Sequence, residues 1–219
     1  PVSAFLDIAG LVRAARDRGC DAIHPGYGFL SENADFAERV EQSGFIFIGP
    51  TPQVIRLIGR SIRRAFANGQ DVAAREDMLM GAYWGGVCIA TSSTTAVHAL
   101  AYPLGGKYRM AHGLSNAILL PSVMAFNQQG NEVRFAAMAR AMGLAVDGLS
   151  DTAAADALVQ ALRQLNTDLN IPNSLQGFGI AASDIDGLVE GASKVTRLLD
   201  NNPRTMARED MRRIYADLL

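Results

Sequence analysis

The stretch "AVHALAYPLGGKYRMAHGLSNAILLP", which runs from Ala96 to Pro121, contains two of the three histidines in this chain of 219 residues. His98 and His112 stand fourteen residues apart among mostly apolar residues. The pattern predicts that His98 lies on a helix that Pro103 and the glycines after it end, and that His112 opens the next helix. Two imidazoles can therefore approach each other from consecutive helices.

Helical patterns surround this stretch, and no convincing strand pattern appears after Val54. The segments between them carry typical helix-end residues, as in "NGQD", "NIPNS" and "DNNPR". Residues 53–219 are thus expected to form an all-α bundle. Its predicted helices cover residues 53–67, 72–90, 94–102, 114–127, 131–142, 151–169, 184–199 and 207–218.

The first 52 residues have a different pattern. "SAFLDIAGLVRAARDRG" is helical, with Ser3 as a plausible N-cap, and the short apolar run "CDAIHPG" is typical of a buried strand. "SENADFAERVEQSG" and "FIFIGP" repeat that order, which is typical of a parallel α/β layer. We therefore expect an α+β chain, with a small two-stranded parallel α/β fragment over residues 1–52 followed by the helical domain over 53–219. Because two strands leave their sheet edges unpaired, we also expect self-association.

Composition excludes several classes of partner. A net charge of −2 argues against nucleic acid and anionic membranes. No apolar run reaches the roughly 18 residues that cross a bilayer, and no signal peptide is visible. Cys20 and Cys88 have no metal-binding spacing and suit free, buried thiols in a reducing cytoplasm. Since the sequence begins at Pro1 and not at Met, it also suggests a piece of a longer protein or a processed product.

The stretch "DAIHPGYGFLSENADFAERVEQSGFIFIGPTPQVI" resembles the N-terminal domain of biotin carboxylases over about residues 2–55, and "HPGYGFLSEN" is specific to that group. In the family this domain precedes an ATP-grasp module, whose residues have no counterpart here. The resemblance therefore implies no carboxylase activity. Gly26 and Gly28 are better explained by a tight turn than by a phosphate-binding loop. A biotin carboxylase fragment is the least favoured description of the whole chain.

The stretches "IRLIGRSIRRAFANGQDVAAREDM", "AVHALAYPLGGKYRMAHGLSNAILLPSVMAFN" and "KVTRLLDNNPRTM" resemble the C-terminal helical domain of iron-containing (group III) alcohol dehydrogenases, from about residue 55 to 219. The resemblance implies a dehydroquinate synthase-like helical fold and NAD(P)-linked hydride transfer between small alcohols and aldehydes or ketones. It also implies a divalent Fe or Zn ion held by an Asp and a His four residues apart and by two His fourteen apart. His98 and His112 match the last two ligands. Tyr102 stands where many members have another His close to the nicotinamide, which makes it the implied cofactor-binding position.

The other two implied ligands would lie before residue 55, where the sequence resembles a carboxylase. His24 and Asp35 are the only nearby residues of the right types, and nothing in their context aims them at the bundle. Two imidazoles alone should hold Fe or Zn weakly, on the order of tens of micromolar or worse. "HPGYGF" also lacks the third glycine and the helix start of a pyrophosphate-binding loop. We therefore expect a dehydrogenase-like domain without activity, and no catalytic residue is identified.

Two alternatives stay open. Each histidine could be a core residue with a backbone hydrogen bond, although the motif around the pair favours descent from a metal site. The chain could also be a non-catalytic helical module, produced by natural fusion, by recombination or by sequence misassembly. If the chain is active, its partner would be a small alcohol or aldehyde. Metal analysis of the purified protein separates the enzyme-derived interpretation from the module.

Overall fold

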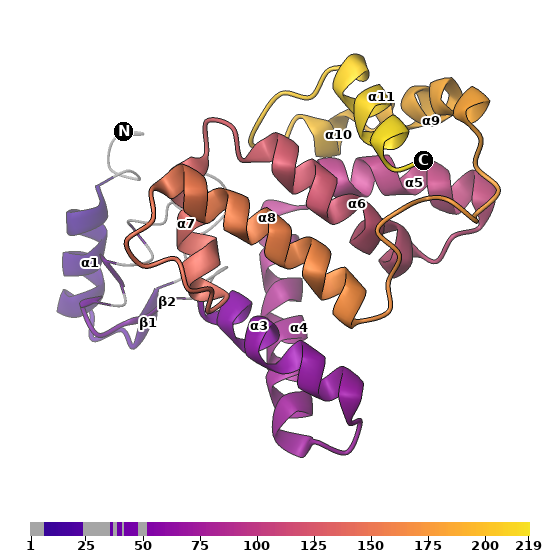
Figure 1. Ribbon diagram of the computed structural model, residues 1–219. Helices are drawn as coiled ribbons and strands as arrows, with labels where there is room; N and C mark the ends of the chain where they lie inside the picture. The colour runs from indigo at the N-terminus through magenta and orange to yellow at the C-terminus, as the bar shows by residue number, and fades with distance from the viewer. Residues whose placement is uncertain (1–6, 24–35, 37–38, 41, 48–51) are drawn as a thin grey trace. The chain divides into compact units, whose positions relative to one another are not determined.

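The computed structural model describes residues 7–23, 36, 39–40, 42–47 and 52–219 (Figure 1). Its internal contacts divide the chain into two compact units, residues 1–93 and 94–219. The predicted division between residues 1–52 and 53–219 follows sequence character rather than compactness, and it stays a prediction. The helices between residues 52 and 93 thus belong to the first compact unit, although their sequence pattern continues into the second.

The first unit begins with α1 (Ile8–Asp17) and a short parallel strand pair. The Asp7 side chain caps α1 by accepting a hydrogen bond from the Gly10 N–H at 2.8 Å. Strand β1 (Ala22–Ile23) pairs with β2 (Ile46–Phe47). Two residues per strand do not establish the predicted α/β fragment. Most of that prediction, with Ser3, His24, Gly26, Gly28 and Asp35, lies outside the described residues.

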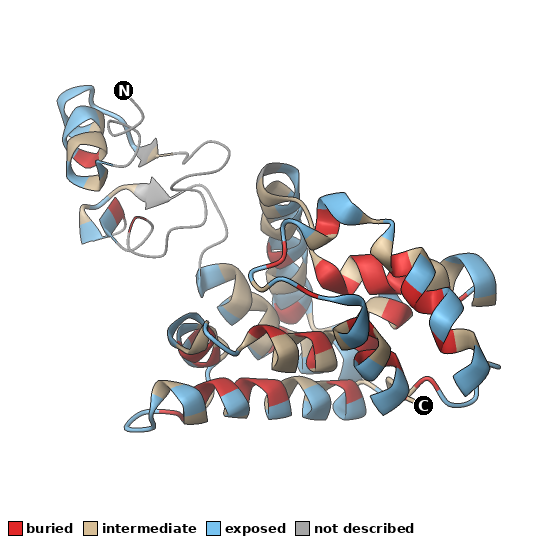
Figure 2. Ribbon diagram, turned by 90° about the horizontal axis from the view of Figure 1, so that it is seen from above, coloured by how far each residue is buried: buried red, intermediate tan, exposed pale blue. Residues whose placement is uncertain are grey.

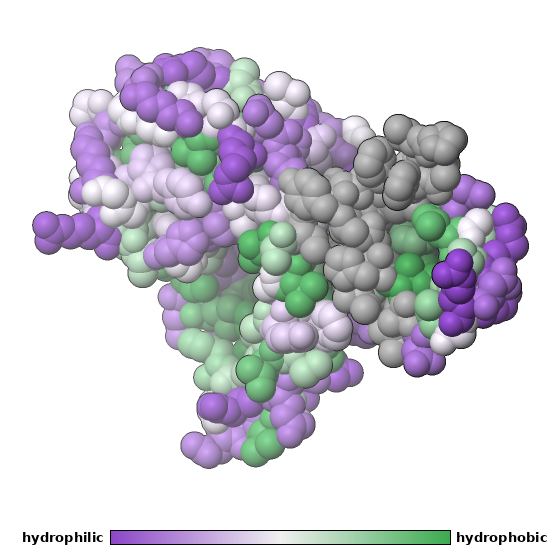
Figure 3. Space-filling view, turned by 180° about the vertical axis from the view of Figure 1, so that it is seen from behind, coloured by the Kyte–Doolittle hydropathy of each residue, from purple (hydrophilic) through white to green (hydrophobic). Residues whose placement is uncertain are grey.

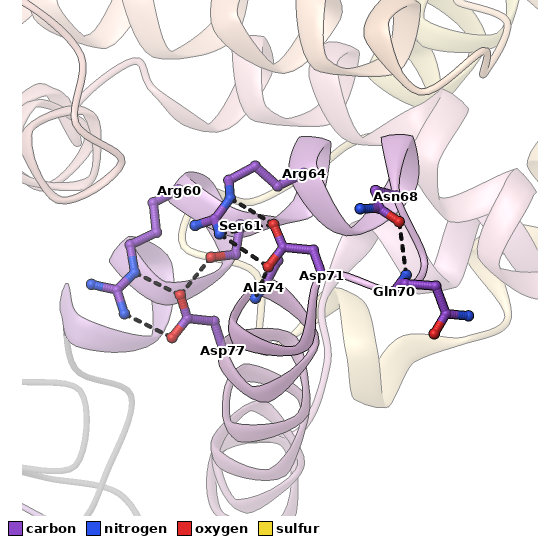
Figure 4. A network of polar contacts seen from close by, with 8 residues as sticks. All are labelled: Arg60, Ser61, Arg64, Asn68, Gln70, Asp71, Ala74 and Asp77. Carbon is purple, nitrogen blue, oxygen red and sulfur yellow. Dashed lines mark hydrogen bonds and ion pairs between the residues drawn. The ribbon is translucent and has the colours of Figure 1, made fainter.

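The first unit also contains a helical hairpin, formed by α3 (Pro52–Ala67) and α4 (Val72–Ser92). Figure 4 shows how carboxylates of the loop and α4 hold side chains of α3. Arg60 donates to both carboxylate oxygens of Asp77 at 2.7 Å, and the Ser61 hydroxyl donates to the same carboxylate at 2.5 Å. Arg64 pairs with Asp71, which also caps α4. These contacts fix the register of the hairpin.

We expect D77N to lower the melting temperature of the hairpin at neutral pH. The Arg60 guanidinium, followed by the Ser61 hydroxyl, holds the pKa of Asp77 at about 2, against an ordinary value of 3.8. A carboxyl whose pKa is depressed in the folded state contributes stability above its unfolded pKa, and that stability is lost as pH falls through the folded pKa. The difference between D77N and the original chain should therefore disappear as pH falls from about 4 to about 2.

Trp84 lies on α4 and is the only tryptophan of the chain, so its fluorescence reports unfolding of the hairpin. E76Q, at an exposed neighbouring position, removes the same charge without touching the Asp77 ion pair. A decrease in the melting temperature of D77N that does not depend on pH would contradict the stabilising role of the Arg60–Asp77 ion pair. An equal decrease in E76Q would contradict it as well.

All regular elements of the second unit are helices, as the sequence pattern after residue 93 predicts. A 3₁₀ turn follows its fourth helix, and the predicted helix over 184–199 is divided into two short ones. The elements are α5 (Ala96–Tyr108), α6 (His112–Asn127), α7 (Glu132–Ala141), α8 (Asp151–Asp168), η3 (Ala182–Asp184), α9 (Ile185–Ser193), α10 (Thr196–Leu199) and α11 (Arg208–Asp217).

The prediction that Pro103 and the following glycines end the helix of His98 is wrong. Helix α5 continues through Pro103 and ends at Arg109, which adopts a left-handed conformation with φ 55°. A proline inside a helix costs about 3 kcal/mol. Full burial of Leu100 and Leu104 on α5 offsets that cost, because each buried leucine contributes about 1.5–3 kcal/mol. Pro103 also explains the glycine at position 191 of α9, because a Cβ atom there would lie only 3.1 Å from the Cβ of Pro103.

Two apolar clusters form the core of the second unit. The larger one joins α5, α6, α9, α10 and α11, and the smaller one lies between α7 and α8. Figure 2 shows the buried residues on the inward sides of these helices. Tyr215 and Leu100 are fully buried in the larger cluster. This cluster anchors both α5 and α6, the two helices that carry the histidines.

The sequence predicts that both cysteines are buried, and the structure differs at one of them. Cys20 is exposed and Cys88 is half-buried, so the expectation of buried thiols is wrong for Cys20. No helix of the described part of the chain is long and apolar enough to cross a membrane. Large apolar side chains are exposed on α3 and α4 (Figure 3): Phe66, Val72, Leu79, Met80, Tyr83 and Ile89.

Candidate metal centre

His98 and His112 come together as the sequence predicts. His98 lies in the first turn of α5, and His112 is the first residue of α6. The left-handed Arg109 ends α5 and lets the chain return within three residues. The centroids of the two imidazole rings are 5.2 Å apart, with an interplanar angle of 53°.

This separation fits two ligands of one ion. Two imidazoles that bind one zinc ion through bonds of about 2.1 Å at a tetrahedral angle have ring centroids about 5 Å apart. The observed 5.2 Å agrees with that spacing. Two packed rings without a metal also have centroids about 4.5–7 Å apart. The role of His98 and His112 as metal ligands therefore stays a prediction.

The surroundings of His98 favour the neutral imidazole that a metal ion needs. Its side chain is half-buried, and burial lowers its pKa. The neighbouring His112 lowers it further, because a positive charge on one ring opposes a positive charge on the other. His98 therefore presents a nitrogen lone pair near neutral pH.

The donor set is incomplete within residues 7–23, 36, 39–40, 42–47 and 52–219. In these residues, no group of three or more His, Cys, Asp or Glu side chains lies close enough to hold one ion. A catalytic divalent site normally takes at least three protein ligands. The candidates His24 and Asp35 fall outside these residues. The described residues thus contain only the two predicted ligands, His98 and His112.

Tyr102 lies one helical turn after His98 on α5. Its ring centroid is 6.3 Å from that of His112, and 45% of the residue is exposed. An exposed aromatic ring at the edge of the histidine pair is suited to contact a planar ligand. The cofactor-binding role that the sequence implies for Tyr102 stays a prediction.

Asn116 belongs to the same cluster, and the sequence reasoning missed it. It lies one turn after His112 on α6, and its Nδ2 atom is 3.2 Å from His112 Nε2 and 3.3 Å from His112 Nδ1. The signal that could have found it is the spacing of four residues, which places both side chains on one face of a helix.

Comparisons with known proteins agree with the two parts of the sequence. The model of the Fe-containing alcohol dehydrogenase family, C-terminal, matches residues 51–219. The model of the biotin carboxylase N-terminal domain matches residues 1–55. The two matches meet at residues 51–55, at the start of α3.

Individual relatives match both parts of the chain, and one dehydrogenase aligns over nearly all of it. Long-chain-alcohol dehydrogenase 1 of Geobacillus thermodenitrificans (strain NG80-2) is 43% identical over 215 residues, which cover 98% of this chain and 52% of that protein. Biotin carboxylase of Haemophilus influenzae (strain ATCC 51907 / DSM 11121 / KW20 / Rd) is 64% identical over 59 residues, 27% of this chain and 13% of that protein. The solved structure of 1,3-propanediol oxidoreductase has a TM-score of 0.74 at 35% identity and covers 77% of this chain and 44% of that one. The chain thus spans about half the length of its curated dehydrogenase relatives.

Proposed function

Because the chain belongs to the Fe-containing alcohol dehydrogenase family, we propose that its helical domain is the metal-holding half of an alcohol dehydrogenase. His98 and His112 are the proposed ligands of a divalent Fe or Zn ion. The proposed reaction is NAD(P)-linked hydride transfer between a small alcohol and its aldehyde or ketone. When bound, the ion would polarise the substrate oxygen.

The observation that carries this proposal is the 5.2 Å separation of two imidazoles held by consecutive helices. The half-buried His98 keeps an unprotonated nitrogen for the ion, and the fully buried core residues of α5 and α6 keep both helices in place. Tyr102 is proposed to contact the nicotinamide side of the site, since its ring stands beside His112. The names of relatives support an alcohol as substrate class, and they include both a small diol, in 1,3-propanediol dehydrogenase of Citrobacter freundii, and a long-chain alcohol, in long-chain-alcohol dehydrogenase 1.

We further propose that this chain alone does not catalyse the reaction. The described residues supply two metal donors, and residues 1–55 match a carboxylase domain in place of a nucleotide-binding domain. Two imidazoles should hold Fe or Zn only in the range of about tens of micromolar.

A non-catalytic fusion or chimeric module is the second candidate. The observation that favours a fusion is that the matches to two unrelated families overlap at residues 51–55. Sequencing of the gene with its flanking regions separates a natural fusion from a misassembled sequence. Self-association is proposed for either case, and the exposed apolar side chains of α4, such as Leu79 and Tyr83, support it.

We expect the purified chain to bind one equivalent of Zn²⁺ with a dissociation constant of about tens of micromolar. H98A and H112A should each weaken this binding at least about tenfold, because a single remaining imidazole cannot chelate. The full chain should show no aldehyde-dependent oxidation of NADH or NADPH. Calorimetric titration and absorbance at 340 nm are the two measurements.

The third histidine provides the control. H24A should bind Zn²⁺ as the original chain does, and a loss in H24A would mean that His24 completes the site. Binding that is unchanged in both H98A and H112A would overturn the metal proposal. Tight stoichiometric metal together with aldehyde-dependent oxidation of NADH would overturn the proposed inactivity.

A further inference from the structure

A pocket with a volume of about 330 Å³ is formed by α6, α8, α11 and the segments next to them in the second unit. Three arginines from different parts of the chain line it: Arg163 on α8, Arg204 in the segment before α11, and Arg213 on α11. Ser122 of α6 also lines the pocket, and it lies ten residues after His112, which is roughly 15 Å along a helix. The pocket is therefore separate from the pair of histidines.

Arg204 is held in place within this pocket. Its Nη1 atom donates to the carbonyl oxygen of Phe126 at 2.8 Å, and its Cζ atom lies 4.0 Å from the centroid of the Phe126 ring. Its own carbonyl oxygen accepts the Nδ2–H of Asn202 at 2.6 Å. A guanidinium group has five N–H donors, so most of them remain after the bond to Phe126. Because this half-buried side chain is already ordered, a ligand can bind it at a low cost in side-chain entropy.

None of the three guanidinium groups has a carboxylate within 4.0 Å among the residues that the structure describes. By contrast, Arg208 in the same unit pairs with Glu190 at 2.7 Å. Positive groups that share one pocket attract an anion. Arginine favours phosphate in particular, because its planar guanidinium group can donate two parallel hydrogen bonds to phosphate oxygens. The three arginines therefore indicate a site for a phosphate group.

Two carboxylates show that the ligand is more than a bare anion. Asp210 and Asp217 also line the pocket, and they stand three residues before and four residues after Arg213 on one face of α11. Asp210 Oδ2 accepts the Ala207 N–H at 2.9 Å, and no other described residue donates to this carboxylate. A carboxylate accepts hydrogen bonds from hydroxyl groups but repels an anion. The pocket thus suits a ligand that carries hydroxyl groups beside its anionic group.

We propose that this pocket binds the phosphate ester of a small polyol, such as a sugar phosphate. Arg163, Arg204 and Arg213 hold the phosphate group, and the carboxylates of Asp210 and Asp217 accept hydrogen bonds from the hydroxyls. The volume of about 330 Å³ is at the lower end of the range of small-molecule pockets, which is about 300–1,000 Å³. This site goes beyond the proposed dehydrogenase function and does not depend on it, since it uses neither the histidine pair nor a metal ion.

The first test is calorimetric titration of the full chain with D-glucose 6-phosphate in a phosphate-free buffer. We expect R163Q and R213Q each to bind this probe about tenfold more weakly than the original chain, because each loses charge-assisted hydrogen bonds to the phosphate. Both arginines are exposed, so their replacement leaves the core intact. R134Q is the matched control. It removes an exposed arginine of α7 outside the pocket, and it should bind within about twofold of the original chain.

Three results of this titration would overturn the proposal. They are no binding of D-glucose 6-phosphate at millimolar concentration, unchanged affinity in both R163Q and R213Q, and an equal loss in R134Q. Far-UV circular dichroism verifies that each variant is folded. Because the titration contains no metal ion and no nicotinamide, its failure would leave the proposed function untouched, and failure of Zn²⁺ binding would leave this site untouched.

The second test separates the hydroxyl groups from the phosphate by comparing D-glucose 6-phosphate with inorganic phosphate. D217A should weaken binding of the sugar phosphate about tenfold, because it removes an acceptor, and should leave binding of inorganic phosphate equal or tighter, because it removes a like charge. E209A removes the same charge from α11 outside the pocket, and it should change neither affinity more than about twofold. Equal affinities of the original chain for the two probes, or tighter binding of both by D217A, would overturn the assignment of a polyol phosphate.

Discussion

Tyr215→Ala is expected to lower the free energy of unfolding of the second compact unit by about 3–5 kcal/mol, the range found when large aromatic core residues are truncated. Tyr215 lies on α11 and is fully buried in the larger apolar cluster. Its removal leaves a cavity between α11 and α5, the helix of His98. Because total stability is normally 5–15 kcal/mol, we expect much of the unit to unfold at moderate temperature.

Tyr215→Phe separates the ring from the hydroxyl. The hydroxyl donates to the backbone carbonyl oxygen of Leu100 at 2.6 Å, and burial raises its pKa well above the ordinary range. Loss of this one hydrogen bond should cost about 1 kcal/mol. Hydrogen exchange of the α5 and α11 amides measures both variants, since the single tryptophan, Trp84, lies in the other unit.

Tyr102→Ala is the control, because Tyr102 is also a tyrosine of the second unit but is 45% exposed. Its loss should change the free energy of unfolding by less than about 0.5 kcal/mol. Equal losses for Tyr215→Phe and Tyr215→Ala would mean that the ring itself contributes no packing, contrary to its burial.

The sequence predicted most of the helices correctly, because the residues that begin and end a helix lie within a few positions of each other. Ser150 caps α8 by accepting the Ala153 N–H at 3.2 Å, and that helix spans Asp151–Asp168 where 151–169 is predicted. The error at Pro103 has a different origin. The ring of Pro103 packs close to the backbone of Gly191, which lies 88 positions later in the chain and has no side chain to crowd it. A window of a few residues around a proline contains nothing about such a partner.

The candidate site also has a part that local sequence predicts and a part that it does not. The spacing and motif around His98 and His112 predicted their approach, since both lie beside one helix-to-helix connection. Asn116 was not predicted, because an Asn inside a helix has many uses and only the position of its amide relative to the ring distinguishes them. Spacing along the chain also does not say whether any further ligand lies beside the pair. That depends on which groups the fold brings there, and the described residues contain no third donor.

Asn127 and Asn202 are expected to be the polar residues of the second unit with the largest effect on stability. Asn127 Nδ2 donates to Asn202 Oδ1 at 3.0 Å, and Asn202 Nδ2 donates to Asn127 Oδ1 at 2.7 Å. Both residues are buried, at 3% and 9% exposure respectively. N127A or N202A should each lower the free energy of unfolding by about 2 kcal/mol, because either change leaves the amide oxygen of the other residue buried without its donor, although Asn202 Nδ2 still donates to the Arg204 carbonyl oxygen.

The double variant distinguishes a paired interaction from two separate ones. Once one amide is lost, removal of the second no longer breaks the pair, so N127A/N202A should cost about 1–2 kcal/mol less than the sum of the single changes. Urea unfolding followed by hydrogen exchange gives the three values. Q164A is the control, because the Gln164 amide bonds to Asp168 on the exposed side of α8 and should contribute less than about 0.5 kcal/mol. Strictly additive losses would contradict the pairing, and they would mean that "DNNPR" acts only as the end of a helix. Non-additive losses would mean that Asn202 ties this segment to α6, the helix that begins with His112.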